Sequence, residues 1–162
     1  MGEANRPRPA RELIHMSTAV LWASRSLCKR LRVGAVLTDE SMRRVLSVGY
    51  NGPGRNLPHD RCSDEEGRCG CLHAEDNAIA MAVNEPRMRL FVTHQPCEQC
   101  AQRIMNCGIE SVRYLWTYRK DDGAQLLASH GIDVQRVDEA LVERHLTLQA
   151  SLTHKALQSP ST

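Results

Sequence analysis

The fold is decided by residues 73–116, which read HAEDNAIAMAVNEPRMRLFVTHQPCEQCAQRIMNCGIESVRYLW. The pattern predicts a helix over 74–83 that ends before Pro86, followed by a strand over 89–93. A second helix is expected from Pro96 to Asn106, with Gly108 in the terminating position, and then a strand over 111–116. This alternation of helix and strand is typical of an α/β protein.

The pattern extends in both directions from this stretch. Upstream we expect a helix over 11–28 and two strands, 33–37 and 44–48, joined by a polar turn as a hairpin. Downstream we expect a helix over 123–129, a strand over 132–137 and a helix over 138–152. Together these elements predict a three-layer α/β/α sandwich with a mixed five-stranded sheet. The domain boundaries are expected to be a loose arm at 1–10, one domain over 11–152 and a frayed tail at 153–162.

Composition limits the classes of function. The chain has 162 residues, 41% of them apolar, which is enough for the core of one compact domain. Its formal net charge of +2 is too small to indicate a nucleic-acid binder, so a small charged metabolite is the expected ligand. Residues 1–12 lack the apolar core of a signal peptide, and no run approaches the roughly 20 apolar residues that span a bilayer. We expect no membrane association and a cytoplasmic location, the host cytoplasm if a phage encodes the chain.

The seven cysteines are the next clue. Cytosolic thiols stay reduced, so clustered cysteines there are more often metal ligands or catalytic groups than disulfides. Cys107 stands alone after an apolar stretch and is expected to be a small buried apolar residue.

Two short motifs carry the candidate chemistry, HAE at 73–75 and PCEQC at 96–100. The imidazole of His73 and the thiolates of Cys97 and Cys100 would supply three zinc ligands and leave the fourth tetrahedral position for water. Glu75, beside the metal rather than on it, would take a proton from that water and deliver it to a ring. H-x-E combined with P-C-x-x-C is the signature of zinc-dependent nucleobase deaminases. The alternative is a closed structural zinc ribbon, in which Glu75 would be an ordinary surface carboxylate.

The sequence also resembles a known family. In order, the similar stretches are CKRLRVGAVL, GYNGPGRNLPH, CLHAEDNAIA, FVTHQPCEQCAQRI, GIESVRYLWTY and GIDV. They are similar to the deoxycytidylate deaminases of bacteria, phages and animals, within the cytidine deaminase superfamily, over about residues 11–137. The resemblance implies a cytidine deaminase-like fold, a catalytic zinc ion, and conversion of dCMP to dUMP and ammonia for thymidylate synthesis. It also implies a homo-oligomer, commonly a hexamer, with dCTP as activator and dTTP as inhibitor.

By position, the resemblance implies that His73, Cys97 and Cys100 hold the catalytic zinc and that Glu75 is the proton shuttle. Asn51 matches a residue that the family places at the substrate sugar; the alternative is a turn asparagine.

Three further residues each have two interpretations. Arg32 would approach a phosphate or be a solvated charge at a strand edge. Tyr118 would lie near the mouth of the active site or serve simple packing. The segment 93–96, THQP, departs from the threonine–leucine–serine–proline segment more usual in the family. Its His94 is expected to be a structural histidine, with substrate contact as the alternative.

A second, structural zinc ion is expected near the long loop between the hairpin and the HAE motif, because several members of the family carry one there. Its expected ligands are the four cysteines Cys28, Cys62, Cys69 and Cys71. His59 is an alternative ligand that would replace Cys62 or Cys69. Four thiolates would close a tetrahedral site and stiffen a segment otherwise too polar to pack. The alternative is a set of free thiols on a flexible loop.

Other functions compete with dCMP deamination. One alternative is a sibling deaminase that acts on cytidine, a guanine-type base or a tRNA adenosine. RNA editing would favour a more basic surface than this chain carries. A second alternative, from another class, is a zinc-stabilised binding module without catalysis.

Overall fold

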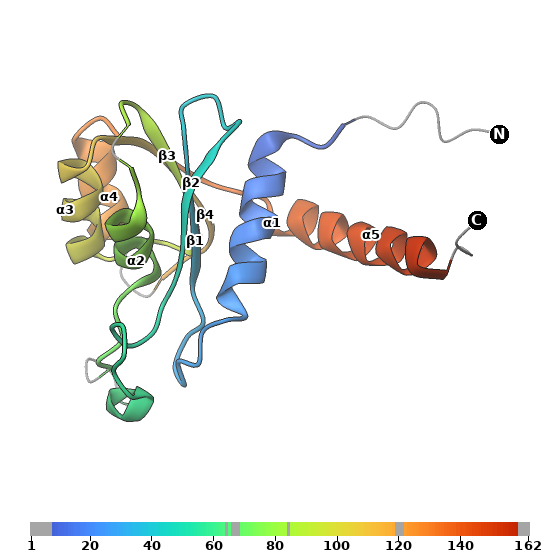
Figure 1. Cartoon of the computed structure of the whole chain (residues 1–162). Coiled ribbons are helices and arrows are strands. Elements are labelled where there is room, and N and C mark those ends of the chain that lie inside the picture. Colours follow the sequence, from blue (N-terminus) through green and yellow to red (C-terminus); the bar gives the residue numbers. More distant parts are fainter. Residues whose placement is uncertain (1–7, 64, 66–68, 84, 119–121, 159–162) are drawn as a thin grey trace.

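The centre of the molecule is a five-stranded sheet with helices on both faces (Figure 1). The computed structural model describes residues 8–63, 65, 69–83, 85–118 and 122–158. The strands are β1 (Gly34–Thr38), β2 (Val45–Tyr50), β3 (Met88–His94), β4 (Ile109–Trp116) and β5 (Asp133–Arg136). The helices are α1 (Arg11–Ala23), α2 (Ala74–Met81), α3 (Glu98–Asn106), α4 (Asp122–Ser129) and α5 (Glu139–Gln158), with a short 3-10 turn, η1, at His59–Arg61.

Strand direction in the sheet is mixed. The strand order is β2-β1-β3-β4-β5. β1 pairs antiparallel with both β2 and β3, whereas β3–β4 and β4–β5 are parallel. Parallel neighbours need a crossover connection, which α3 and α4 provide between successive strands. The predicted mixed five-stranded sheet is confirmed.

The turn between β1 and β2 is closed by one carboxylate. Asp39 Oδ1 accepts hydrogen bonds from the backbone N–H groups of Arg43 and Arg44, both at 2.9 Å, and Oδ2 accepts the hydroxyl proton of Ser41 at 2.6 Å. These bonds, with that of Ser41 the strongest, lower the pKa of Asp39 to about 2. The polar turn predicted from the sequence therefore has a specific device that fixes the hairpin.

Helices form a layer on each face, as predicted. In Figure 1, α2, α3 and α4 lie on one side of the sheet, and α1 and α5 lie on the other. Successive side chains of a strand point alternately to the two helix layers. Val36 and Phe91 pack toward α1 and α5, whereas the residues on either side of each in the strand pack toward α2, α3 and α4. All five residues of β1 are buried, as expected for a strand covered on both faces.

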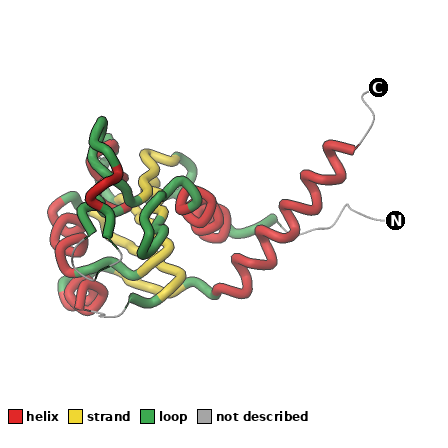
Figure 2. Tube along the Cα trace, turned by 90° about the horizontal axis from the view of Figure 1, so that it is seen from below, coloured by secondary structure: helices red, strands yellow, loops and turns green. Residues whose placement is uncertain are grey.

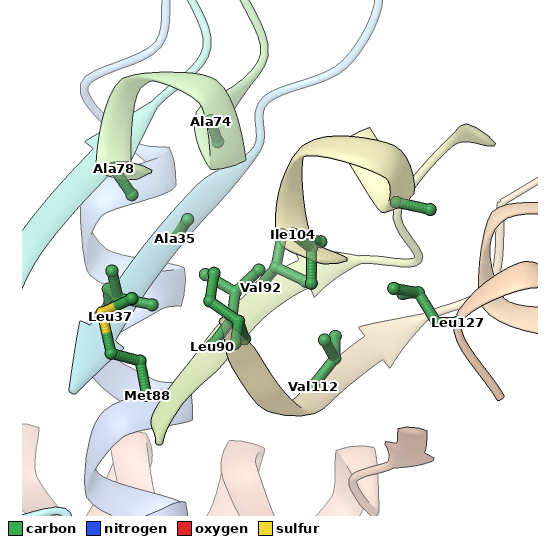
Figure 3. Close-up of a cluster of buried hydrophobic side chains, with 12 residues drawn as sticks. Ala35, Leu37, Ala74, Ala78, Met88, Leu90, Val92, Ile104, Val112 and Leu127 are labelled. Atoms are coloured by element: carbon green, nitrogen blue, oxygen red, sulfur yellow. The ribbon is translucent and has the colours of Figure 1, made fainter. Parts of the chain in front are cut away.

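The larger core cluster fixes the layer that carries the motifs. It places Ala74 and Ala78 of α2 and Ile104 of α3 over the central strands (Figure 3). Val92 and Ile104 are fully buried, and full burial of such a side chain contributes about 1.5–3 kcal/mol. The starts of α2 and α3 are thus held against the sheet by adjacent apolar contacts.

Several helix boundaries differ from prediction. α1 ends at Ala23 rather than 28, because the Ser24 hydroxyl bonds to the Leu21 carbonyl at 2.6 Å and the following residues close tighter turns. α3 begins at Glu98, so Pro96 precedes the helix and Cys97 occupies its N-cap position.

α5 extends to Gln158 instead of ending near residue 152, so the predicted end of this helix is wrong. Its distal half runs out from the rest of the chain (Figure 2). Residues 1–7 of the predicted arm and 159–162 of the predicted tail lie outside the described residues. No described helix is long and apolar enough to cross a lipid bilayer.

Candidate metal centre and active site

The two motifs meet where α2 and α3 begin. His73 immediately precedes α2, Cys97 immediately precedes α3, and Cys100 lies in the first turn of α3. The His73 Nδ1 atom lies 3.2 Å from Cys100 Sγ and 3.5 Å from Cys97 Sγ. The structure therefore brings the three sequence-predicted ligands into one cluster, with all ligand atoms within 4.8 Å of one another.

These spacings fit a tetrahedral zinc ion. With bonds of about 2.0–2.1 Å to nitrogen and about 2.3 Å to sulfur, the edge between an N and an S ligand would be about 3.6 Å. The observed 3.2 and 3.5 Å are close to this edge. A donor set of one imidazole and two thiols suits zinc and leaves a fourth position for a non-protein ligand.

The pKa values of the two thiols in this cluster are shifted in opposite directions. Hydrogen bonding by Cys100 and by the His73 imidazole lowers the pKa of Cys97 to about 4. The hydrogen bond between the two thiols and the burial of Cys100 both raise the pKa of Cys100. Asp76 accepts a weak hydrogen bond from Cys100 Sγ at 3.9 Å and forms an ion pair with Arg103, so α2 and α3 are also tied together behind the cluster.

Glu75 lies beside this cluster in the first turn of α2 and is only 4% exposed. Burial raises its pKa to about 7. A buried carboxyl group that titrates near neutrality, in a pocket and next to metal-ligating groups, is typical of an acid–base catalyst rather than of a surface charge.

A glycine that sequence reasoning missed supports the Cys97 segment. A Cβ on Gly123 of α4 would lie 2.2 Å from the Pro96 carbonyl oxygen and 2.6 Å from the Cys97 carbonyl carbon. Only glycine lets α4 approach this closely. A glycine within a predicted helix, where it costs roughly 1 kcal/mol relative to alanine, was the available signal.

One pocket connects most of the predicted residues. Its lining includes His73, Glu75 and Cys97 together with the following residues: Cys28, Arg30, Leu31, Val33, Asn51, Cys69, Cys71, Ala74, His94, Gln95 and Tyr118. Arg32 is exposed and does not line it. Arg30 does, and its Nη2 atom donates to the Tyr118 hydroxyl at 3.4 Å.

Asn51 holds in place the segment of chain that leads into β1. Its Oδ1 accepts the N–H of Val33 at 2.8 Å, and its Nδ2 donates to the Leu31 carbonyl at 2.7 Å. One amide proton and one oxygen lone pair remain for a ligand in the pocket. Asn51 is therefore more than a turn residue, and a contact with a sugar stays a prediction.

The four loop cysteines form a second cluster, in which Cys28, Cys62, Cys69 and Cys71 have sulfur atoms within 4.8 Å of one another. Three of the distances are 3.7, 3.7 and 3.8 Å. A tetrahedron with Zn–S bonds of about 2.3 Å has edges of about 3.8 Å. His59 Nε2 lies 3.6 Å from Cys71 Sγ but does not belong to the group of four mutually close ligand atoms.

A three-layer α/β/α sandwich that carries one imidazole and two thiols beside a buried carboxylate defines the class of zinc-dependent nucleobase deaminases. Residues 9–116 match the family model for the cytidine and deoxycytidylate deaminase zinc-binding region. The chain belongs to this family, and zinc is its metal. The resemblance and the fold predicted from the sequence are thereby confirmed.

Individual relatives support the same assignment. Deoxycytidylate deaminase of Saccharomyces cerevisiae is 36% identical over 143 residues, which cover 80% of this chain and 45% of the yeast protein. ComE operon protein 2 of Bacillus subtilis is 36% identical over 145 residues, 79% of this chain and 72% of that one. The crystal structure of dCMP deaminase from cyanophage S-TIM5 with dCMP and dUMP matches with a TM-score of 0.73 and 31% identity, covering 82% of this chain and 100% of that one. The chain thus spans less than half of the yeast relative's length.

Proposed function

We propose that this chain catalyses the hydrolytic deamination of dCMP to dUMP and ammonia. The observation that carries the proposal is the buried Glu75, with its pKa near 7, in the same pocket as the His73, Cys97 and Cys100 cluster. Two relatives support the choice of substrate: the yeast relative is a deoxycytidylate deaminase, and the phage dCMP deaminase was crystallised with dCMP and dUMP.

The chemistry divides between the metal and the carboxyl group. His73, Cys97 and Cys100 would hold the zinc ion, which would supply a Lewis acid that brings the pKa of water toward neutrality. Glu75 accepts a proton from the attacking water as the oxygen bonds to C4 of the ring, and it delivers this proton to ring nitrogen N3. Glu75 then takes the remaining hydroxyl proton and passes it to the exocyclic amine. The C4–N bond breaks, ammonia leaves and the uracil carbonyl remains.

We assign binding of the substrate phosphate to Arg30 in place of Arg32. Arg30 carries a permanent positive charge and lines the pocket, while Arg32 is exposed. The Tyr118 hydroxyl, which accepts a hydrogen bond from Arg30, would fix the orientation of the guanidinium. A cation and a hydroxyl at one site favour a nucleotide over a free nucleoside.

Substrate selection tests the function directly. Zinc-loaded protein is incubated with dCMP, CMP, deoxycytidine and dCTP, and ammonia release is followed together with the change in ultraviolet absorbance. We expect turnover of dCMP to exceed that of deoxycytidine. Preferred turnover of CMP or deoxycytidine would assign the chain to a sibling activity, and zinc binding without any ammonia release would favour a binding module.

The four-thiol cluster is proposed to hold a structural zinc ion. Its sulfur spacing fits a closed tetrahedral site, and the loop it would fasten leads into His73. Purified protein should contain two zinc ions per chain, and Cys62→Ser should contain one while losing loop order in NMR spectra. A single zinc ion in the wild-type chain would reject this second site.

Assembly and regulation are proposed from the family resemblance. Apolar side chains at the end of α2 and on the adjoining loop are exposed, with Met81 at 66%, Val83 at 71% and Leu57 at 58%, and such a surface favours contact with another protein. Light scattering is expected to give a homo-oligomer, a hexamer in the family pattern. Turnover measured with added dCTP and dTTP tests whether these nucleotides activate and inhibit it.

A further inference from the structure

His94 lies at the end of β3 and lines the active-site pocket, yet the deamination steps above do not use it. Its ring packs against Trp116, the residue beside it on the parallel strand β4, with ring centroids 5.0 Å apart. Trp116 is in turn fixed by a hydrogen bond from its Nε1 atom to Glu139 of α5 at 2.7 Å. The imidazole is therefore held in one orientation by elements outside the pocket.

The neighbouring hydroxyl decides which nitrogen of His94 carries the proton. Thr93 is fully buried, and its Oγ1 accepts the N–H of Gly34 at 3.2 Å. The other hydrogen-bond partner of Oγ1 among the described residues is His94 Nδ1 at 3.0 Å. If Nδ1 were the donor, the hydroxyl proton of Thr93 would be buried without an acceptor, which costs about 1–3 kcal/mol. The Thr93 hydroxyl therefore donates to Nδ1, and the proton of the neutral imidazole must lie on Nε2.

Charge and geometry then limit what His94 can offer a ligand. Burial lowers the pKa of His94, so the ring stays neutral at physiological pH. A neutral ring with Nδ1 occupied presents one N–H donor and no acceptor. It complements a carbonyl, hydroxyl or phosphate oxygen, and it cannot pair with the exocyclic amine of cytosine.

We propose that His94 binds the nucleotide through its Nε2–H group, as a neutral donor to an acceptor oxygen of the substrate, with Thr93 fixing the tautomer. This inference rests on the proposed function for the identity of the ligand. It makes His94 a substrate-binding residue and not a general acid. Its contribution should appear in KM, because a contact present in both the ground state and the transition state leaves kcat largely unchanged.

Two variants of His94 separate its hydrogen bond from its packing. His94→Phe keeps a planar ring against Trp116 but has no donor. His94→Gln places an amide N–H near the position of Nε2. We expect the KM for dCMP to rise about three- to tenfold in His94→Phe, the range for one neutral hydrogen bond, and to return toward the wild-type value in His94→Gln. Equal KM values in the two variants, or no rise in His94→Phe, would overturn the proposal.

The same variants locate the acceptor. If it is a phosphate oxygen, the rise in KM should disappear with deoxycytidine; if it is the 3′-hydroxyl, it should disappear with 2′,3′-dideoxycytidylate. A rise that persists with both substrates assigns the base carbonyl.

Long-range ¹H–¹⁵N NMR correlations of the histidine rings give a readout that does not depend on activity. In zinc-loaded wild-type protein, His94 should show a protonated Nε2 and an unprotonated Nδ1, and Thr93→Val should release the Nδ1 contact and mix the two tautomers. A protonated Nδ1 in the wild type would refute the inference even if dCMP is the substrate. Absence of dCMP turnover with the expected tautomer would instead count against the proposed function.

Discussion

Replacing Gly123 by alanine tests whether α4 holds the Cys97 segment in place. The added Cβ would lie 2.2 Å from the Pro96 carbonyl oxygen, whereas ordinary van der Waals contact begins at 3.4 Å. Helix α4 or the backbone at 96–97 must therefore move by about 1.2 Å, the difference between these distances. Because the atoms it meets are backbone, no side-chain rotation relieves the clash.

The size of the effect follows from this displacement. Overpacking of this kind costs about 1–3 kcal/mol, and each 1 kcal/mol lowers the Tm of a domain of this size by roughly 2–4 °C. Metal-free Gly123→Ala should melt roughly 2–12 °C below the wild type. Metal sites tolerate only about 0.2 Å in ligand distance, so zinc binding at the Cys97 cluster should weaken by roughly tenfold or more.

The assay is competition for zinc against a chromophoric chelator, alongside thermal unfolding of the metal-free protein. Gly131→Ala is the matched control. Gly131 has a φ of 81° and no heavy atom within 4 Å of an added Cβ, so alanine there strains the backbone without touching Cys97. Gly131→Ala should lose stability and keep its zinc affinity. If both variants lose zinc affinity equally, or if Gly123→Ala binds zinc like the wild type, α4 does not position the ligand.

Three further predictions concern the pocket and the hairpin. Glu75→Gln should retain zinc and fold but lose at least about a hundredfold in kcat, the lower range for general acid–base catalysis; unchanged turnover would reject the proton-shuttle role. Arg30→Met should raise the KM for dCMP more than that for deoxycytidine, while Arg32→Met should change neither; the reverse pattern would restore the phosphate role to Arg32. The folded-state pKa of Asp39, about 2, lies below its ordinary 3.8, so its stabilisation is complete above pH about 4 and is lost as the pH falls through 2. Asp39→Asn should therefore be less stable than wild type at pH 7 and approach it near pH 2, as measured by urea unfolding across that range.

The sheet was predictable because its signals are local. Apolar periodicity at 74–83, the strand at 111–116 and the polar turn at 38–43 each reflect contacts within a few residues or one buried face. The two motifs were predictable for the same reason, since each supplies its groups within a single helical turn.

Features that depend on distant contacts were not predictable. Sequence periodicity extends the first helix to residue 28. Only the family resemblance, and no local pattern, indicated that Cys28 joins sulfur atoms from a loop more than thirty residues later. Which of the two arginines, Arg30 or Arg32, lines the pocket depends on the path of the backbone between them. Hydrogen bonds from Asn51 fix that path, and no local sequence pattern encodes them. The end of α5 was missed because 153–158 lacks a strong apolar pattern, although residues 139–159 contain no glycine or proline that would end the helix.

A single residue, Leu72, separates the last loop cysteine, Cys71, from His73. Leu72 is bonded to Gly52 in both directions, N–H to carbonyl at 2.7 Å and carbonyl to N–H at 3.1 Å. The two clusters therefore share one anchored length of chain. An extra residue at position 72 would displace the loop cysteines from the catalytic cluster by up to about 3.8 Å, one Cα step. The same insertion between Cys62 and Cys69 would add only about 0.1 kcal/mol in loop entropy. Inserting one residue at each of these positions and measuring the zinc content should show that only the insertion at 72 lowers it. The length of the chain can therefore vary within the loop but not over residues 71–73, which join the loop to the active site.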